Sequence, residues 1–132
     1  MTFVHDYSFG KTQEERVLTK ICKFFNEEIK QTTAFCRWDF ESFNTIYELK
    51  SRNVFSSTYN DVMINYSKIQ PIYKAQYFLF NFTDGLFYIK YDQHVFADFE
   101  LKVFKREGRT DFNDKPQVVC HIPILALTKM DK

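Results

Sequence analysis

The sequence contains little glycine, proline or cysteine, with three of each among 132 residues. The shortage of glycine and proline argues against a disordered or low-complexity chain. The cysteines are widely spaced and form no CxxC motif, which predicts reduced thiols in an intracellular protein and not a disulfide framework. They are Cys22, Cys36 and Cys120.

Long apolar runs are also missing. No apolar stretch approaches about 18 residues, and the N-terminus has no apolar signal core. We therefore expect a soluble chain without a membrane partner. A net charge of +1 neither favours nor excludes a nucleic-acid partner, since a local patch can still be basic.

Two classes of site have no sequence signal. There is no glycine-rich phosphate loop, so nucleotide hydrolysis of the P-loop type is not supported. His5, His94 and His121 are dispersed without ligand spacing, so we expect no zinc site.

Aromatic residues are abundant. They make up 19% of the chain, and hydrophobic residues make up 45%. At this length the chain has material for one core, so residues 1–132 are expected to form a single, strand-rich domain.

Two helices are predicted. Apolar residues spaced by three or four predict the first from Thr12 to about Lys30, after a loosely held lead-in, and Thr12 with Glu15 forms a capping-box pattern at its start. The second follows a loop at residues 53–57, starts with Thr58 and Asp61, and ends near residues 69–70 because of Pro71. Its predicted face comprises Tyr59, Val62, Met63, Tyr66, Ile69 and Tyr73.

Strands are predicted around these helices. Two aromatic runs flank Asp84-Gly85 within residues 77–91, a strong signal for a hairpin with a type I′ turn, and residues 77–82 suit a central strand. Further strands are expected at about residues 98–105 and 118–122, with a short helix after Pro123. This order predicts an α+β or mixed α/β domain.

The stretch of greatest chemical interest is residues 37–52, which read RWDFESFNTIYELKSR. We interpret it as a β-hairpin with Asp39 on one arm and with Glu48 and Lys50 on the other. Alternate residues of a strand share a face, so Glu48 and Lys50 point the same way.

The pairing of the two arms depends on the turn. A two-residue loop at Phe43-Asn44 puts Asp39 opposite Glu48 and Arg37 opposite Lys50. A loop at Asn44-Thr45 puts Asp39 opposite Lys50 and Glu41 opposite Glu48. A three-residue loop breaks this parity. Directly opposed carboxylates are unfavourable unless a cation lies between them.

The acidic-x-Lys pattern occurs three times, so the triplet alone is weak evidence. Glu28-Ile29-Lys30 is most simply a solvated end of the first helix. Glu100-Leu101-Lys102, with Asp98 on the same face, is most simply the outward face of a strand. Glu48-Leu49-Lys50 differs because both faces of its strand look partly covered, and burying charges there without a function would be costly.

The order of the predicted elements resembles that of the PD-(D/E)xK nuclease superfamily. The order is a helix, a strand with Asp39, a strand with the Glu48-Leu49-Lys50 triplet, a helix and a strand. The segments WDFESFNTIYELKSR, TYNDVMINYSKI and YFLFNFTDGLFYIKY are similar to small phage- and virus-type members, and the resemblance covers residues 12–91. Trp38 stands where the name-giving proline would be. The resemblance implies a restriction-endonuclease-like core, in which helices flank a mixed central β-sheet.

The resemblance also implies a mechanism. Asp39, Glu48 and the backbone carbonyl of Leu49 would ligate Mg²⁺ or Mn²⁺, which lowers the pKa of a bound water and stabilises charge on the scissile phosphate. Lys50 would orient that water or neutralise the phosphate. Relatives often add an acidic residue from the first helix, for which Glu15 is the candidate beside its capping role. A basic residue from the second helix would be Lys68.

Lys68 and Arg52 are the candidates for contacting nucleic acid, with solvated surface charges as the ordinary alternative. Basic residues of the C-terminal third could contact phosphate as well. They are Lys102, Lys105, Arg106, Arg109 and Lys115.

The function expected from these features is a metal-dependent endonuclease that acts on DNA ahead of RNA, as a homodimer that spans a duplex. The alternative is a binding or assembly module on the same fold that has lost catalysis. In that case aromatic side chains would form a protein interface or a base-stacking surface. They are Tyr59, Tyr66, Tyr73, Tyr77 and Phe96.

Overall fold

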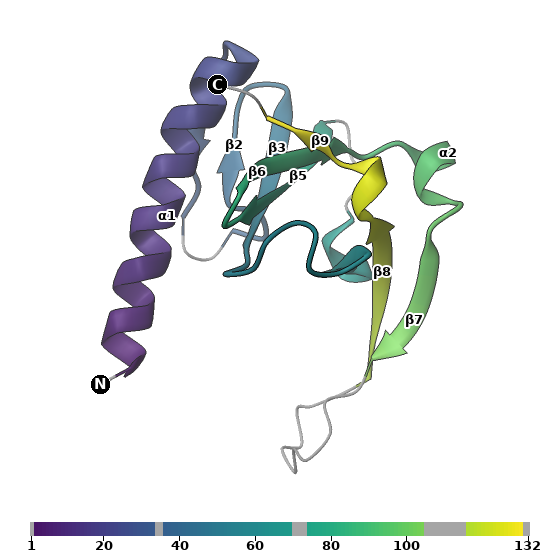
Figure 1. Ribbon diagram of the computed structural model, residues 1–132. Helices are drawn as coiled ribbons and strands as arrows, with labels where there is room; N and C mark the ends of the chain where they lie inside the picture. Colours follow the sequence, from purple (N-terminus) through teal and green to yellow (C-terminus); the bar gives the residue numbers. More distant parts are fainter. Residues whose placement is uncertain (1, 34–35, 70–73, 105–115, 131–132) are drawn as a thin grey trace.

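A six-stranded mixed sheet lies between a long helix and a three-stranded antiparallel sheet (Figure 1). The computed structural model describes residues 2–33, 36–69, 74–104 and 116–130. In chain order its elements are α1 (Thr2–Phe25), β1 (Lys30–Gln31), β2 (Phe40–Glu41), β3 (Thr45–Ser51), β4 (Asp61–Asn65), the 3-10 turn η1 (Tyr66–Lys68), β5 (Ala75–Phe82), β6 (Gly85–Lys90), α2 (Gln93–Phe96), β7 (Glu100–Phe104), β8 (Gln117–Pro123), the 3-10 turn η2 (Ile124–Ala126) and β9 (Thr128–Lys129).

The large sheet has the strand order β1-β2-β3-β5-β6-β9, and the small sheet has the order β4-β8-β7. The β3–β5 pair is parallel, whereas the other neighbours are antiparallel. A parallel pair needs a long crossover. Residues 52–74 form that connection and carry β4 and η1. The predicted α+β class with a mixed sheet is confirmed.

Helix α1 differs from the prediction at both ends. It begins at Thr2, so Thr12 lies inside the helix and the capping-box prediction for Thr12 and Glu15 is wrong. A helix propagates cooperatively, and no proline interrupts residues 2–11. The helix ends at Phe25 because Asn26 has a φ of 53°, which is a common helix stop. The triplet that begins at Glu28 therefore follows the helix.

The predicted second helix is wrong. Residues 61–65 form strand β4, which pairs with β8 of the small sheet, and the predicted helical segment contains only the single turn η1 among its described residues. Val62 and Ile64 are β-branched and share one face of the strand, with Asp61, Met63 and Asn65 on the other. Pro71 lies outside the described residues. The second face of the large sheet is therefore covered by a sheet and not by a helix.

The hairpin at residues 77–91 is confirmed, but its turn lies one residue earlier than predicted. Phe82 pairs with Gly85, so Thr83 and Asp84 are the central turn residues. Among the described non-glycine residues only Asn26 has a positive φ, so the predicted type I′ turn is wrong. Gly85 has a φ of 148°, and a Cβ at that position would lie 2.9 Å from Lys129 Cε.

The later elements follow the prediction in part. Strands β7 and β8 lie where strands were expected. The short helix expected after Pro123 is the single 3-10 turn η2, and strand β9 follows it. Strands β1 and β9 have two residues each and α2 has four, so they have no recognisable period in the sequence.

The core has two parts, one on each face of the large sheet. On one face Val17 and Ile21 of α1 pack with Tyr47 and Leu79. On the other face Phe78, Phe80 and Phe82 of β5 pack against the small sheet. Strand β5 is therefore buried on both faces, which confirms the predicted central strand. None of the described helices is long and apolar enough to cross a membrane.

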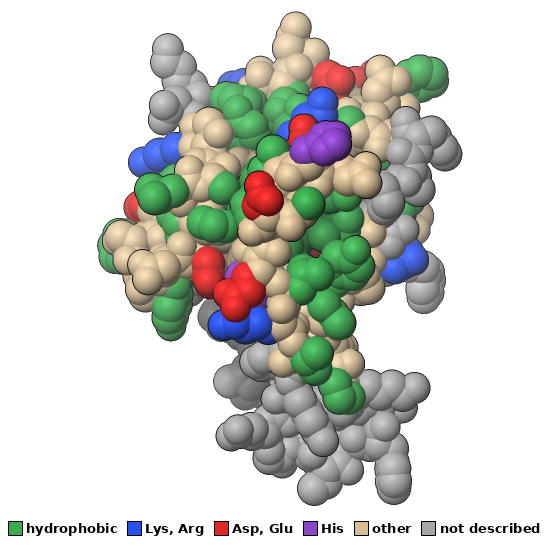
Figure 2. All heavy atoms as spheres, turned by 90° about the vertical axis from the view of Figure 1, so that its right-hand side faces the viewer, with side chains coloured by type: hydrophobic (Ala, Val, Ile, Leu, Met, Phe, Trp, Pro, Cys, Tyr) green, Lys and Arg blue, Asp and Glu red, His purple; other side chains and the backbone are tan. Residues whose placement is uncertain are grey.

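The small sheet also exposes apolar side chains. Figure 2 looks onto the side where β7 and α2 lie and shows hydrophobic side chains at the surface. Val103 pairs with Val118 and Leu101 shares their face; these side chains are 71%, 41% and 49% exposed. The buried Cys120 lies on this same face, opposite Leu101. The face of the small sheet that packs in the core therefore extends, with apolar side chains, to the protein surface.

The end of helix α1 gives a stability prediction. Replacing Asn26 by Val puts a β-branched residue at a positive φ, and we expect the free energy of unfolding to fall by about 1–2 kcal/mol in urea titrations. Asn26→Gly, the control, should unfold at the same or a slightly higher urea concentration. Equal stability of the Val variant and the wild type would contradict this account of the helix end.

Candidate functional site

The β2–β3 hairpin has the first of the two registers considered above. Phe40 pairs with Tyr47 and Glu41 with Ile46, and Ser42 N donates to Thr45 O at 2.8 Å. The two-residue loop is therefore Phe43-Asn44, and this register places Asp39 beside Glu48.

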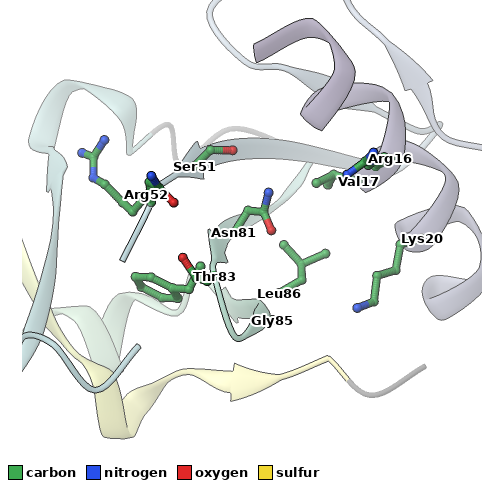
Figure 3. Close-up of a pocket in the computed structure, with 11 residues that line it drawn as sticks. Arg16, Val17, Lys20, Ser51, Arg52, Asn81, Thr83, Gly85 and Leu86 are labelled. Atoms are coloured by element: carbon green, nitrogen blue, oxygen red, sulfur yellow. The ribbon is translucent and has the colours of Figure 1, made fainter. Parts of the chain in front are cut away.

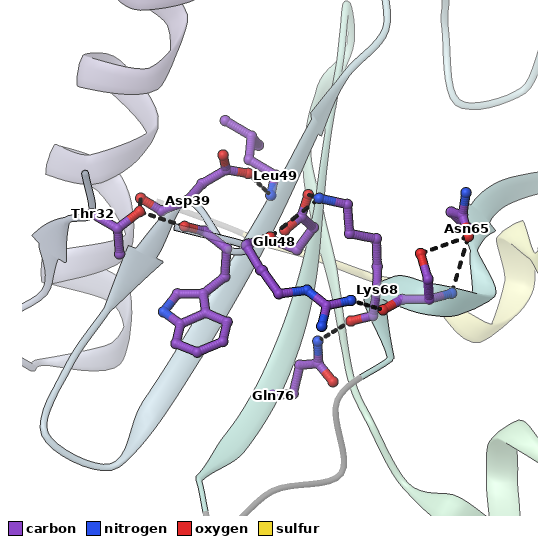
Figure 4. A network of polar contacts seen from close by, with 10 residues as sticks. Thr32, Asp39, Glu48, Leu49, Asn65, Lys68 and Gln76 are labelled. Carbon is purple, nitrogen blue, oxygen red and sulfur yellow. Dashed lines mark hydrogen bonds and ion pairs between the residues drawn. The ribbon is translucent and has the colours of Figure 1, made fainter. Parts of the chain in front are cut away.

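Asp39 is fixed at the start of β2 (Figure 4). Its N–H donates to Tyr47 O at 3.0 Å, and its Oδ2 accepts a hydrogen bond from the Leu49 N–H at 2.8 Å. Strand β2 has only two residues, so the Asp39 carboxylate acts as acceptor where the ladder stops. This contact holds one carboxylate oxygen and leaves the other available to a ligand.

The backbone of Leu49 faces Asp39. In an extended strand the N–H and C=O of one residue point to the same side. Because the Leu49 N–H points to the Asp39 carboxylate and away from β5, the Leu49 carbonyl also lies on the Asp39 side. A carboxylate oxygen and a backbone carbonyl oxygen thus occur together at this edge of β3.

Glu48 is buried, with 7% of its surface exposed. Lys68 of η1 places its Nζ 3.5 Å from Glu48 Oε1 and donates to the Arg37 carbonyl at 3.2 Å. Figure 4 shows Lys68 reaching Glu48 from the crossover. The Lys68 backbone is held in turn by Gln76, whose Nε2 donates to its carbonyl at 2.6 Å. The crossover therefore positions a cation at the buried carboxylate.

The charge of Asp39 perturbs Glu48. Burial, followed by the charge of Asp39, raises the pKa of Glu48 to about 7, against the opposing charges of Lys68 and Lys50. Burial also raises the pKa of Asp39, and the hydrogen bond from Leu49 opposes this shift. A cation placed between the carboxylates would remove the repulsion that raises the pKa of Glu48.

Lys50 lies on the same strand face and is half-buried. Burial, followed by the charge of Arg52, lowers its pKa, whereas the charges of Glu48 and Asp39 act in the opposite direction. Lys50 therefore interacts with both carboxylates and with Arg52.

The first helix supplies Glu14, not the expected Glu15, to this region. Glu15 is exposed, whereas Glu14 is partly buried and accepts a hydrogen bond from Gln31 Nε2 at 2.7 Å. Burial, followed by the charge of Asp39, raises the pKa of Glu14. Residues three apart on a helix lie on the same side, and Glu14 precedes the buried Val17 by three residues. The helical spacing therefore indicated that Glu14 faces the sheet.

Arg52 follows β3 and is exposed. It lines a pocket of about 400 Å³ together with Arg16 and Lys20 of α1. Figure 3 shows the two helix residues on one side and Arg52 on the other, with Asn81 and Leu86 between them. Among the described residues that line the pocket none is acidic, so it suits an anion. Sequence reasoning selected Arg52 and missed Arg16 and Lys20.

The two rival triplets lie elsewhere. Glu100 and Lys102 are exposed and form an ion pair with each other at 3.6 Å, and Asp98 is exposed. Lys30 and Glu28 are also exposed. Of the three triplets only Glu48-Leu49-Lys50 has a buried carboxylate.

The chemistry of the site suits a hard divalent cation. The described part of the chain contains no group of three or more His, Cys, Asp or Glu side chains placed to hold a metal. Mg²⁺, however, is usually held by one or two carboxylates and retains several waters. Asp39, Glu48 and the Leu49 carbonyl provide such a donor set.

Comparisons with known proteins add no family assignment. The chain matches no protein-family model, and neither a curated protein nor a solved structure shows significant similarity to it.

The buried Glu48 gives a pH prediction for the metal-free protein. Its pKa is about 7 in the folded state against 4.5 in the unfolded state. The contribution of Glu48 to the free energy of unfolding is therefore fully present below pH 4.5 and is lost as the pH rises to about 7. A shift of this size corresponds to about 3 kcal/mol. Glu48→Gln removes this loss, so the variant should gain up to that amount over the wild type between pH 4.5 and 8.

Urea unfolding at several pH values in a chelator would measure this difference. A constant difference between the two proteins across this range would contradict the burial of an ionisable Glu48. Added Mg²⁺ or Mn²⁺ should stabilise the wild type at pH 8 and leave Glu48→Gln nearly unchanged.

Proposed function

We propose that this protein is a divalent-metal-dependent nuclease that hydrolyses phosphodiester bonds in DNA. The observation that carries the proposal is geometric. Asp39 and Glu48 lie together at one hairpin, with Lys50 on the same strand and Lys68 brought in by the crossover. Paired carboxylates with nearby lysines are the groups that phosphodiester hydrolysis with a metal requires.

The order of elements supports a restriction-endonuclease-like core. A helix precedes the strand with Asp39, the strand with the triplet follows, and β5 pairs with it in parallel. The departure is the crossover, which contains β4 and η1 where the resemblance predicts a helix. Lys68 nevertheless reaches Glu48 from this crossover.

In this proposal Asp39, Glu48 and the Leu49 carbonyl hold Mg²⁺ or Mn²⁺. When bound, the metal activates water and neutralises charge on the scissile phosphate. Asp39 presents one oxygen because Leu49 holds the other. Lys68 contacts Glu48 Oε1, which fixes the carboxylate and leaves Oε2 for the cation.

Lys50 contacts the reacting phosphate or the attacking water in this proposal. Its lowered pKa reflects a position in which its charge is poorly solvated, where an anionic phosphate would be a favourable partner. Lys68 acts as a positioning residue through Glu48. For the acidic residue of the first helix we favour Glu14 over Glu15, since Glu14 lies close enough to interact with Asp39.

The cationic pocket extends the site along the substrate. Arg52 both interacts with Lys50 and lines the pocket with Arg16 and Lys20. A nucleic-acid backbone that passes Lys50 would therefore place neighbouring phosphates at these three cations. Association of two copies to span a duplex stays a prediction.

The first test is cleavage. We expect the wild type to cut DNA in Mn²⁺ or Mg²⁺ and not in a chelator, and we expect Asp39→Ala and Lys50→Ala to lose at least about 100-fold in rate. Lys30→Ala is the matched control because it alters an exposed copy of the same triplet, and its rate should be unchanged.

Folded wild-type protein that binds no metal and cuts no DNA would contradict the nuclease proposal. The alternative, a binding or assembly module without catalysis, would then be favoured. Cleavage that survives in both site variants would assign the activity to other residues.

The second test is the salt dependence of DNA binding in a chelator. Arg16→Ala and Lys20→Ala should each reduce the slope of log K against log salt by about 0.7 on a single strand. Lys23→Ala is the control, since Lys23 is exposed on the same helix but does not line the pocket. Equal slopes for all four proteins would rule out phosphate binding in the pocket.

A further inference from the structure

A second pocket of about 400 Å³ opens directly beside Lys50. Lys50 and Arg52 line it together with apolar side chains and with the polar residues Asn53, Ser56 and Asp61. Phe55 and Tyr59 of the crossover are among the apolar side chains. The pocket thus joins the charged site to an apolar surface.

Two aromatic side chains of this pocket are exposed. Phe55 is 57% exposed and Tyr59 is 66% exposed, although the fold has a core that could bury aromatic residues. Exposed aromatic rings beside cations are the elements of surfaces that bind single-stranded nucleic acid, because rings stack on bases while cations contact phosphates.

The loop that carries these rings is held in place. Ser56 donates to the Asp84 carboxylate through its N–H at 2.8 Å and its hydroxyl at 2.6 Å, and Thr83 N donates to Val54 O at 2.9 Å. The loop is thereby tied to the β5–β6 turn, so it would lose little conformational entropy on binding.

The charge of the pocket fits the same ligand. The acidic residue that lines it, Asp61, lies 3.3 Å from His121 Nδ1, while Lys50 and Arg52 provide two cations. A ligand with an aromatic ring and a neighbouring negative charge matches this distribution, and a nucleotide within a strand has both.

We propose that the site takes an unpaired nucleotide of a single strand, with its base between Phe55 and Tyr59 and its phosphate at Lys50 and Arg52. This inference rests on the proposed nuclease function and specifies its substrate. A base stacked inside a duplex cannot enter a pocket unless it is first unstacked and unpaired, which costs free energy. The site therefore favours single strands and unpaired regions over continuous duplex.

The experiment measures binding in a chelator, where no metal-dependent cleavage occurs, by the fluorescence anisotropy of labelled oligonucleotides. The probes are an oligo-dT single strand, a duplex of equal length and a single strand of abasic residues. The abasic strand has the same phosphate charge without bases. We expect the wild type to bind oligo-dT at least about tenfold more tightly than either of the other probes.

Two substitutions test the pocket directly. Phe55→Ala and Tyr59→Ala should each weaken oligo-dT binding about tenfold and leave binding to the abasic strand unchanged. Phe43→Ala is the matched control because its side chain is an exposed aromatic outside this pocket, and it should bind oligo-dT like the wild type.

Equal binding of oligo-dT and the abasic strand, or equal losses in the pocket and control variants, would overturn the inference. The failure of the nuclease proposal would appear differently. Pocket-dependent binding of oligo-dT without any cleavage in Mn²⁺ would retain the base pocket and reject the nuclease. Cleavage of duplex at the single-strand rate, undiminished in Phe55→Ala and Tyr59→Ala, would retain the nuclease and reject the base pocket.

Discussion

The parallel pairing of β3 with β5 determines where the candidate site lies. It runs without interruption from Thr45 opposite Ala75 to Ser51 opposite Asn81. Parallel neighbours need a crossover, and here the crossover returns across the face that carries Glu48 and Lys50. The same segment delivers Lys68 to Glu48 and the rings of Phe55 and Tyr59 to the pocket beside Lys50. The position of the candidate site therefore follows from the crossover between β3 and β5.

Burial of Glu48 opposes stability. A buried carboxylate beside a second carboxylate loses solvation and suffers repulsion, and the ion pair with Lys68 offsets this only in part, since the pKa of Glu48 still rises to about 7. A strand at this position would be more stable with an apolar residue. Such a conflict between local stability and the retained residue is typical of functional sites, where a ligand supplies the missing interaction.

Much of the hairpin was predictable because its signals are local. The alternation along residues 45–51 and the choice of a two-residue loop fix which side chains share a face, and one of the two predicted registers is the observed one. The central strand β5 was predictable for the same reason, since its aromatic run is apolar on both faces.

The errors have physical causes of longer range. Strand β4 pairs with β8, far away in sequence, and its residues also fit a helical spacing, so the tertiary pairing decided between the two. Glu15 was predicted as the acidic residue of the first helix, whereas Glu14 is the one that interacts with Asp39. The two pockets combine residues from several elements, so Arg16, Lys20 and Phe55 had no local signal that joined them to Lys50.

The proposed nuclease requires that Asp39 and Glu48 together bind a divalent cation. Crystals soaked in Mn²⁺ would test it most directly, through the anomalous scattering of the metal. We expect one strong peak within coordination distance of an Asp39 oxygen, a Glu48 oxygen and the Leu49 carbonyl. An ordered site without a peak, or Mn²⁺ bound instead at the exposed Asp98 and Glu100, would contradict it.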